Sequence, residues 1–409
     1  ATAYGIMNEN SGSSVSAGSL TFTGVSATGG NASTTGDAYA NAYVLENNNG
    51  GSVTATGTIT AAATATGGYG PTASASAYGL ENSGTISGTN FDLTLTATGG
   101  TGTVAGVENT DDSAEACAVE NSGTFSMSGG ANKIKVTATG GKSSDNAVVY
   151  ARAYGIRNSG SMTLTGPTTF SVEATGGTPD TNIANSYASD AYAIAYGLYN
   201  QADEVSTGAL TFDLVQAKGG TGEDAHGKAV GIYNKNAPFT IMAESVVMTK
   251  INAEGGNGLR DASATAYGIR NRSSTFISTS STAANSLNVT AKGGTIVGSG
   301  DDTKYAYADA YGLTNEDDGV ANLKGSWNIK VQADGGKLAE GLTADNTSAA
   351  AIGVSNEGTH NVTFEGPLTI TAAATGNATG TKAAVRAVGI GSASSTVALL
   401  DAVTISASV

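Results

Sequence analysis

The chain has one cysteine, five prolines and no long apolar run. Cys117 has no second cysteine to pair with, so no disulfide forms within the chain, and stability has to come from a core or from stacked strands. The shortage of proline excludes collagen-like and polyproline II structure, because both need proline to fix φ. No stretch of about 18 apolar residues occurs, so we expect this segment not to insert into a membrane. No signal peptide is recognisable at the N-terminus.

Positive charge is also scarce. Nineteen Lys and Arg residues stand against 34 Asp and Glu, a net charge of −15. Nucleic-acid binding needs a basic patch, so we expect no nucleic-acid partner. Only 13% of residues are charged and 39% are hydrophobic, which is too few charges for a disordered acidic chain. What is abundant is glycine, with 58 residues, among many Thr, Ser, Ala and Val, and this composition predicts an ordered, β-rich protein.

One short string organises the whole sequence: Ala-Tyr-Gly-Ile/Leu-x-Asn, here called the anchor. About eleven copies occur, separated by 34 residues (Gly197 to Gly231) to 44 residues (Gly268 to Gly312). A fixed internal period of this length is typical of solenoid or propeller folds. The tyrosine position of the successive copies is occupied by Tyr4, Tyr43, Tyr78, Cys117, Tyr154, Tyr196, Val230, Tyr267, Tyr311, Ile352 and Val388.

A second mark, Ala-Thr-Gly-Gly or a variant of it, follows each anchor and closes a predicted strand. Before it, apolar and polar residues alternate, as in the segment 91–98, which is the pattern of a strand with one face in the core. We expect Gly-Gly to form a turn there because glycine adopts positive φ at little cost. A shorter strand is predicted between the two marks, after Asn-Ser-Gly turns such as Asn158-Ser159-Gly160.

Alanine alternates with variable residues in the segment that leads into each anchor. Ala262, Ala264 and Ala266 represent the constant register, which we expect to face inward. Before Gly268 every second residue, ending at Ala266, is expected to face inward, and after it Ile269 is the apolar residue. The inward-facing positions must therefore shift by one residue at the glycine, which is a change of parity along the strand. A bulge or bend at Gly268 and its equivalents would produce this change.

Three strands per repeat predict one coil per repeat of an all-β, right-handed parallel β-helix. It would have about eleven coils of 34–44 residues, stacked about 4.8 Å apart. Residues 1–409 form a single domain of imperfect repeats in this interpretation, whether or not they belong to a longer chain. Asparagine would then stack at one corner, aliphatic residues inside and tyrosine outside. Two shorter coils per repeat remain an alternative, whereas eleven blades are too many for a propeller.

The repeats at 153–166 and 174–177 resemble the passenger regions of autotransporter-like surface proteins of Gram-negative bacteria, and the resemblance covers essentially the whole chain. It implies an exported right-handed β-helix at the bacterial cell surface, often adhesive or self-associating. The family's signal peptide and membrane domain are absent from this sequence, so the secretion route stays open.

No catalytic, metal or cofactor site is predicted. His226 and His360 are more than a hundred residues apart and lack zinc-site spacing, so exposed loop positions are expected for both. A β-helix enzyme that cleaves polysaccharides would need carboxylates at one strand position in adjacent repeats. Outward carboxylates of the longer strands have Thr or Lys as neighbours at the equivalent positions; they are Asp92, Glu173, Glu254 and Asp334. Such a lyase or hydrolase is therefore the alternative to a non-enzymatic protein, and an ice-binding threonine face is disfavoured because charged residues interrupt it.

The predicted function is a structural or adhesive surface rod. Its partners would be other copies, bound head-to-tail or laterally, or a host or bacterial surface protein or glycan. Both chain ends lie inside predicted strands without a cap, which favours such association. Seven outward tyrosines either reinforce the sheet or form a contact surface: Tyr4, Tyr43, Tyr78, Tyr154, Tyr196, Tyr267 and Tyr311.

Overall fold

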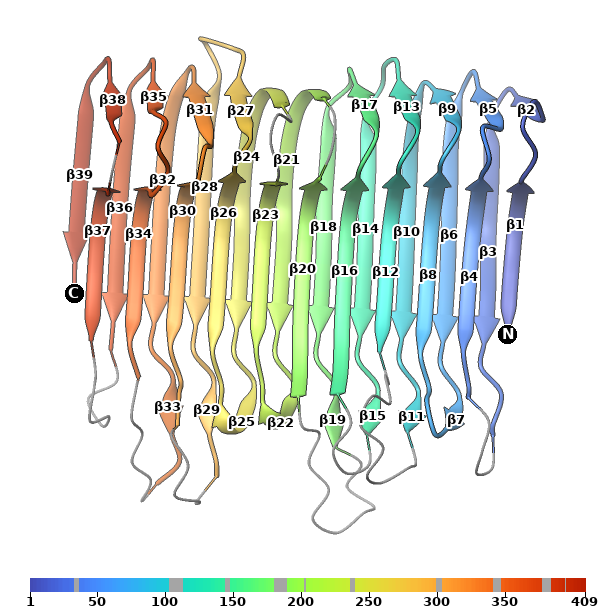
Figure 1. The fold of residues 1–409 in the computed structure, drawn as a ribbon, viewed down its shortest axis with the longest axis horizontal. Helices are drawn as coiled ribbons and strands as arrows, with labels where there is room; N and C mark the ends of the chain where they lie inside the picture. The colour runs from blue at the N-terminus through green and yellow to red at the C-terminus, as the bar shows by residue number, and fades with distance from the viewer. Residues whose placement is uncertain are drawn as a thin grey trace.

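The computed structural model describes residues 1–32, 37–102, 113–143, 148–179, 190–201, 204–235, 240–298, 304–340, 347–376, 384–393 and 395–409. Within these ranges the chain is all-β, without a helix, and the paired strands are parallel. Figure 1 shows the strands stacked side by side along the long axis, with the two termini at opposite ends. The predicted parallel β-solenoid is confirmed.

The first side of the solenoid consists of the strands that carry the anchor string. Each pairs in register with the next anchor strand, for example Tyr4 with Tyr43 and Asn8 with Asn47, so one repeat makes one coil and the two-coil alternative is wrong. The described residues form eleven of these strands, and all but the first and the last have an anchor strand on both sides. In order they are β1 (Thr2–Asn8), β4 (Ala40–Asn47), β8 (Ala75–Asn82), β12 (Ala114–Asn121), β16 (Val148–Asn158), β20 (Asp190–Asn200), β23 (Gly227–Lys235), β26 (Ala264–Arg272), β30 (Ala308–Glu316), β34 (Ala349–Asn356) and β37 (Val385–Ser392).

The second side combines the predicted short and long strands in one sheet. The short strands are β2 (Ser14–Ala17), β5 (Ser52–Ala55), β9 (Thr85–Gly88), β13 (Thr124–Met127), β17 (Ser161–Leu164), β27 (Thr275–Ser278), β31 (Val320–Leu323), β35 (Val362–Phe364) and β38 (Val397–Leu399). The long strands are β3 (Leu20–Thr28), β6 (Thr58–Thr66), β10 (Asn90–Thr98), β14 (Asn132–Thr139), β18 (Thr168–Thr175), β28 (Ala284–Lys292), β32 (Ser326–Asp334), β36 (Leu368–Thr375) and β39 (Val403–Ser408). In two coils the short and long strands merge, as β21 (Val205–Lys218) and β24 (Thr240–Glu254).

A third set of short strands, which the sequence did not predict, follows the Gly-Gly turns. Their members pair from coil to coil beside the first two sides. They are β7 (Tyr69–Gly70), β11 (Thr101–Gly102), β15 (Lys142–Ser143), β19 (Thr178–Pro179), β22 (Thr221–Asp224), β25 (Asn257–Asp261), β29 (Thr295–Ile296) and β33 (Lys337–Leu338).

The alanine register faces the core, as predicted. Ala264 and Ala266 are buried, and one apolar cluster runs through the stack from the first coils to the last. The parity change is also confirmed, because Gly268 and Ile269 are both buried in succession within β26. Gly268 has no paired residue in the neighbouring strand β30, whereas Tyr267 pairs with Tyr311 and Ile269 pairs with Leu313.

The anchor glycine makes room for a large side chain from the opposite sheet. A Cβ on Gly5 would lie 2.8 Å from the ring of Phe22, and one on Gly155 would lie 2.7 Å from the ring of Phe170. In the second coil the sizes are exchanged, since Val44 stands in register with Gly5 and Ala61 in register with Phe22. The core is therefore filled coil by coil, with a small residue on one sheet matched by a large one on the other.

The prediction that the Gly-Gly turns need positive φ is wrong. Among the described glycines φ is positive at Gly12, Gly50, Gly130 and Gly325, none of which belongs to an Ala-Thr-Gly-Gly turn. The reason for glycine is instead the close approach of neighbouring coils. A Cβ on Gly256 would lie 1.9 Å from the carbonyl oxygen of Gly220, so no larger residue fits at this turn.

Candidate functional site

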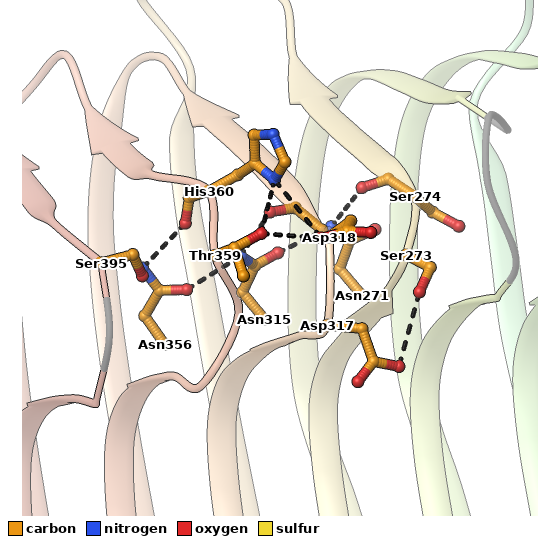
Figure 2. A network of polar contacts seen from close by, with 11 residues as sticks. Asn271, Ser273, Ser274, Asn315, Asp317, Asp318, Asn356, Thr359, His360 and Ser395 are labelled. Atoms are coloured by element: carbon orange, nitrogen blue, oxygen red, sulfur yellow. Dashed lines mark hydrogen bonds and ion pairs between the residues drawn. The ribbon is translucent and has the colours of Figure 1, made fainter.

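An asparagine ladder occupies the corner after each anchor strand and fixes the position of everything on the outer face. From Asn8 to Asn356, the Nδ2 of each buried asparagine donates to the Oδ1 of its counterpart in the next coil, over 2.7 to 3.1 Å. Figure 2 shows the last rungs, where Asn271, Asn315 and Asn356 follow one another and Ser395 accepts the final bond. The predicted asparagine stack is confirmed.

The same asparagines also hold the turns. The amide of Asn271 donates to the carbonyl oxygen of Ser274 over 2.7 Å, and that of Asn315 to the carbonyl oxygen of Gly319 over 2.7 Å. A buried amide needs partners for all its polar atoms, and here the turn and the neighbouring coils supply them. The buried asparagine amides of this corner are therefore structural.

The seven predicted contact tyrosines lie on the outer face of the anchor sheet in three separate stacks. Tyr4, Tyr43 and Tyr78 stack with ring centroids 5.1 Å apart, Tyr154 and Tyr196 at 5.4 Å, and Tyr267 and Tyr311 at 4.9 Å. Cys117 interrupts the column after the first stack and Val230 after the second.

Most of these tyrosines are covered by one another and by their neighbours. Tyr4 is 46% exposed, whereas Tyr196 is only 8% exposed. Arg157 lies over the ring of Tyr154, with its guanidinium 5.1 Å from the centroid. Burial raises the pKa of Tyr154 to about 12, and desolvation is the largest cause. The column therefore offers less aromatic surface to a partner than its sequence pattern indicates.

A second aromatic group fills the interruption at Val230. Tyr199 and Tyr233 occupy the position three residues after the tyrosine column in β20 and β23, and their centroids are 5.3 Å apart. Together with Tyr196 they cover Val230, which is fully buried. Arg270 lies over Tyr233 at 5.1 Å and forms a two-bond pair with Glu316. These residues form a packed surface cluster.

The lone cysteine occupies the tyrosine position of its anchor, as the repeat pattern predicts, but it is buried there, although this register was expected to face outward. Cys117 is fully buried, and burial raises the pKa of its thiol. A thiol held protonated and out of solvent is a poor nucleophile. Cys117 is therefore a packing residue.

Three carboxylates in adjacent coils were missed in the sequence. Glu46, Glu81 and Glu120 occupy the variable position of the anchor in β4, β8 and β12 and are in direct register. Desolvation, then the charges of Glu120 and Glu46, raise the pKa of Glu81 to about 7. Arg157 ends the column, 2.6 Å from Glu120 and 3.1 Å from Glu115. Comparing the variable anchor position between consecutive repeats would have revealed this column.

A second acidic column lies where the anchor strands begin. Asp190, Asp224 and Asp261 are in register in successive coils, and Arg260 binds Asp224 at 2.6 Å. His226 lies 3.7 Å from Asp261 and stacks on Tyr192, with ring centroids 4.8 Å apart. His226 therefore lies in a loop between β22 and β23, as expected, but it is half-buried and not exposed, because it packs between these groups.

The other histidine is exposed, as predicted. His360 lies in the turn between β34 and β35, 3.9 Å from Asp318 and within hydrogen-bond distance of Thr359 (Figure 2). The two histidines are in different coils and on different faces of the repeat, so the structure does not bring them together.

A groove of about 420 Å³ runs along the Gly-Gly turns over five successive coils. It is lined by the turn glycines between Gly176 and Gly294, by threonines and by Asn257. Three cationic residues, Lys218, Lys292 and Lys337, stand on its rim together with one acidic residue, Glu254.

Neither a metal site nor a membrane span is found in the part of the chain that the structure describes. No group of three or more His, Cys, Asp or Glu side chains there could hold a metal ion. No helix that is long and apolar enough to cross a membrane occurs in the same ranges. Comparison with protein-family models, with curated proteins and with solved structures gave no match.

Proposed function

We propose that this protein is a non-enzymatic structural or adhesive rod of a bacterial cell surface. The observation that carries the proposal is the continuity of its interior. One apolar cluster and one asparagine ladder pass through the successive coils, so each coil is held by the next. In a solenoid of this kind the stability is a sum over coils and their interfaces, and the product is a long, rigid surface.

The expected location and partners follow from the same proposal. The resemblance of the repeats to passenger regions supports an exported, extracellular protein. The outermost coils support association with a further copy or further coils, because each has one sheet edge without a partner in the described structure. The last strand, β39, is exposed along its length, and Ile405 is 47% exposed. Unpaired strand edges with apolar side chains promote self-association.

Electron microscopy of the purified chain tests the rod. Single rods or end-to-end fibres are expected, and compact globules would contradict the proposal. The adhesive role is tested by coating beads with the protein and counting their attachment to bacterial or host cells. Beads coated with an unrelated β-rich protein are the control, and equal attachment of both would remove the adhesive part.

A polysaccharide-cleaving enzyme is the second candidate, and the glutamate column favours it. Glu81, with a pKa near 7, lies beside Glu120, which is paired with Arg157. Glycosidases use two neighbouring carboxyl groups, of which the general acid has a raised pKa. Against it, the column lies on the outer face of a sheet and its carboxyl groups stay partly exposed to water, which limits the desolvation of reacting groups.

A depolymerisation assay separates the two candidates. The wild-type chain and the Glu81→Gln variant are incubated with a panel of acidic and neutral polysaccharides, and new reducing ends are measured. We expect no release from either protein. Release by the wild type that Glu81→Gln abolishes would establish the enzyme instead of the rod.

A further inference from the structure

The rim of the glycine groove is more cationic than the equivalent edge elsewhere in the molecule. In β3, β6 and β10 the residue before the Gly-Gly turn is threonine: Thr28, Thr66 and Thr98 are in register. In β21 and β28 the same position carries Lys218 and Lys292. Glu254 and Asp334 occupy it in the coils that follow these two, so lysines alternate with carboxylates along this part of the edge, and Lys337 adds a further positive charge on a chain whose net charge is −15.

The three lysines of the groove are available to a ligand. Lys218, Lys292 and Lys337 are exposed, and no carboxylate among the described residues lies within ion-pairing distance of their amino groups. Glu254 stands between Lys218 and Lys292 in the register, and Asn252 donates to its carboxylate over 3.0 Å. The residues that line the groove thus carry three positive charges against one negative charge, and Asp334, in register with Lys292, places a second carboxylate on the same edge.

The shape of the groove selects an extended, slender ligand. The turn glycines that line it carry no side chains, and it continues along the rod from coil to coil. Threonine hydroxyls and the amide of Asn257 also line it, so hydroxyl groups of a ligand find hydrogen-bond partners along its length.

Two other kinds of extended chain fit this groove less well. A peptide that adds a strand needs a free sheet edge, but β18, β21, β24 and β28 beside the groove are each paired on both sides. Two groove strands with a single partner, β19 and β33, are only two residues long, which is too short an edge to hold a peptide strand. A single-stranded nucleic acid is held largely by stacking of its bases on aromatic rings, and no aromatic residue lines the groove.

We infer that the groove formed by the Gly-Gly turns between Gly176 and Lys337 binds a linear acidic polysaccharide along the rod axis. Lys218, Lys292 and Lys337 bind its carboxylate groups, and the threonines and Asn257 bind its hydroxyls. The inference deepens the proposed function, on which it rests, by assigning the rod a glycan partner and a place to bind it.

Titration of a fluorescently labelled oligogalacturonate with the purified chain tests this site. The wild type should bind it, with an affinity that falls as salt is added. A neutral maltooligosaccharide of the same length and single-stranded polyadenylate are the comparison ligands. No binding of the oligogalacturonate by the wild type, or equal or tighter binding of either comparison ligand, would overturn the inference.

The charge variants locate the binding. Replacing Lys218, Lys292 and Lys337 together by Gln should weaken binding about tenfold, since each exposed charge contact contributes modestly. Glu254→Gln should tighten it severalfold, a gain that misfolding cannot imitate. The matched control is Lys330→Gln, an exposed lysine of β32 outside the groove, which should change nothing.

The outcomes separate this inference from the proposed function. If the triple variant binds oligogalacturonate as well as the wild type does, the glycan binds outside the groove and the inference is wrong. The proposed adhesive function could still be supported by attachment of the coated beads. The protein could also bind oligogalacturonate while beads coated with it fail to attach to cells. That result would support the binding groove and contradict the adhesive role.

Discussion

At the scale of the residue, the asparagine ladder shows how one polar side chain can be both buried and indispensable. Asn158 donates to Asn200 over 2.8 Å, accepts from Asn121 over 2.8 Å and donates to the carbonyl oxygen of its own turn, Gly160. Each bond is modest in net terms, but a buried polar group that loses its partner is costly. Replacing an asparagine within the ladder should therefore destabilise the fold.

Asn158→Ala should lower the free energy of unfolding by about 2 kcal/mol, because the amide groups of Asn121 and Asn200 each lose a partner in the interior. Urea unfolding followed by circular dichroism measures the effect. The control is Asn288→Ala, which removes an exposed asparagine that donates to the carbonyl oxygen of Thr249 over 2.9 Å. An equal loss of unfolding free energy in both variants would show that a ladder asparagine contributes no more to stability than an exposed asparagine does.

Glu81 makes the stability of the protein depend on pH near neutrality. Its pKa is raised by burial and neighbouring carboxylates from 4.5 to about 7. Between these two values the folded state binds more protons than the unfolded state, so this group lowers stability as pH rises from 4.5 to 7. Above pH 7 the penalty is fully present.

Glu81→Gln should therefore raise the free energy of unfolding at pH 8 by about 1 kcal/mol, because solvent screens a half-exposed group and reduces the full effect. At pH 4.5 the variant and the wild type should unfold alike. Urea unfolding at both pH values measures the difference, with the exposed Glu365→Gln as the control. A Glu81→Gln variant no more stable than the wild type at pH 8 would refute the assignment.

At the scale of the element, the two sheets compensate for each other's side-chain sizes. The pair Val44 and Ala61 replaces the pair of glycine and phenylalanine seen as Gly5 and Phe22 in the coil before. Core positions that share one space change together, and their mutational effects are coupled rather than additive.

A double-mutant cycle on the second coil tests this coupling. Val44→Gly alone should cost about 2 kcal/mol by leaving a void, and Ala61→Phe alone a similar amount by overfilling the core. The double variant recreates the arrangement of the first coil and should regain most of the loss, with a coupling energy of about 1–3 kcal/mol. Thermal and urea unfolding of the four proteins give the cycle, and strictly additive losses would contradict the shared space.

Much of each element could be predicted from the sequence, because periodicity reports which face of a strand is buried. The alanine register, the parity change at Gly268 and the strand at 91–98 all follow from it. Contacts between coils are harder to predict, since they depend on which residues of two different repeats become neighbours. For this reason the crowding at Gly256, the column at Glu81 and the groove beside Lys292 emerged only in the structure.

At the scale of the whole molecule, each interior coil is covered on both sides and each outermost coil on one side only. The difference is visible in burial: β39 is exposed throughout, whereas alternate residues of β18 are buried. In a solenoid, stability is shared between nearest neighbours, so unfolding should begin at the ends.

Hydrogen exchange followed by mass spectrometry measures this gradient. Backbone amides of β39 and β37 should exchange well before those of β18 and β16 in the middle of the stack. Uniform exchange along the chain would show instead that the rod unfolds as one cooperative unit. If copies join end to end, the protection of the outer coils should rise with protein concentration.

The asparagine ladder also makes the rod electrically polar. Every side-chain amide between Asn8 and Asn356 points its N–H toward the next coil, so their dipoles add in one direction, as peptide dipoles do in a helix. The two ends of the ladder are therefore chemically different: it begins at the oxygen of Asn8, which accepts from Ser13, and ends at the amide of Asn356, which donates to Ser395. A filament built from such rods would have a direction, with every subunit oriented the same way along it, and rods meeting at like ends would be disfavoured.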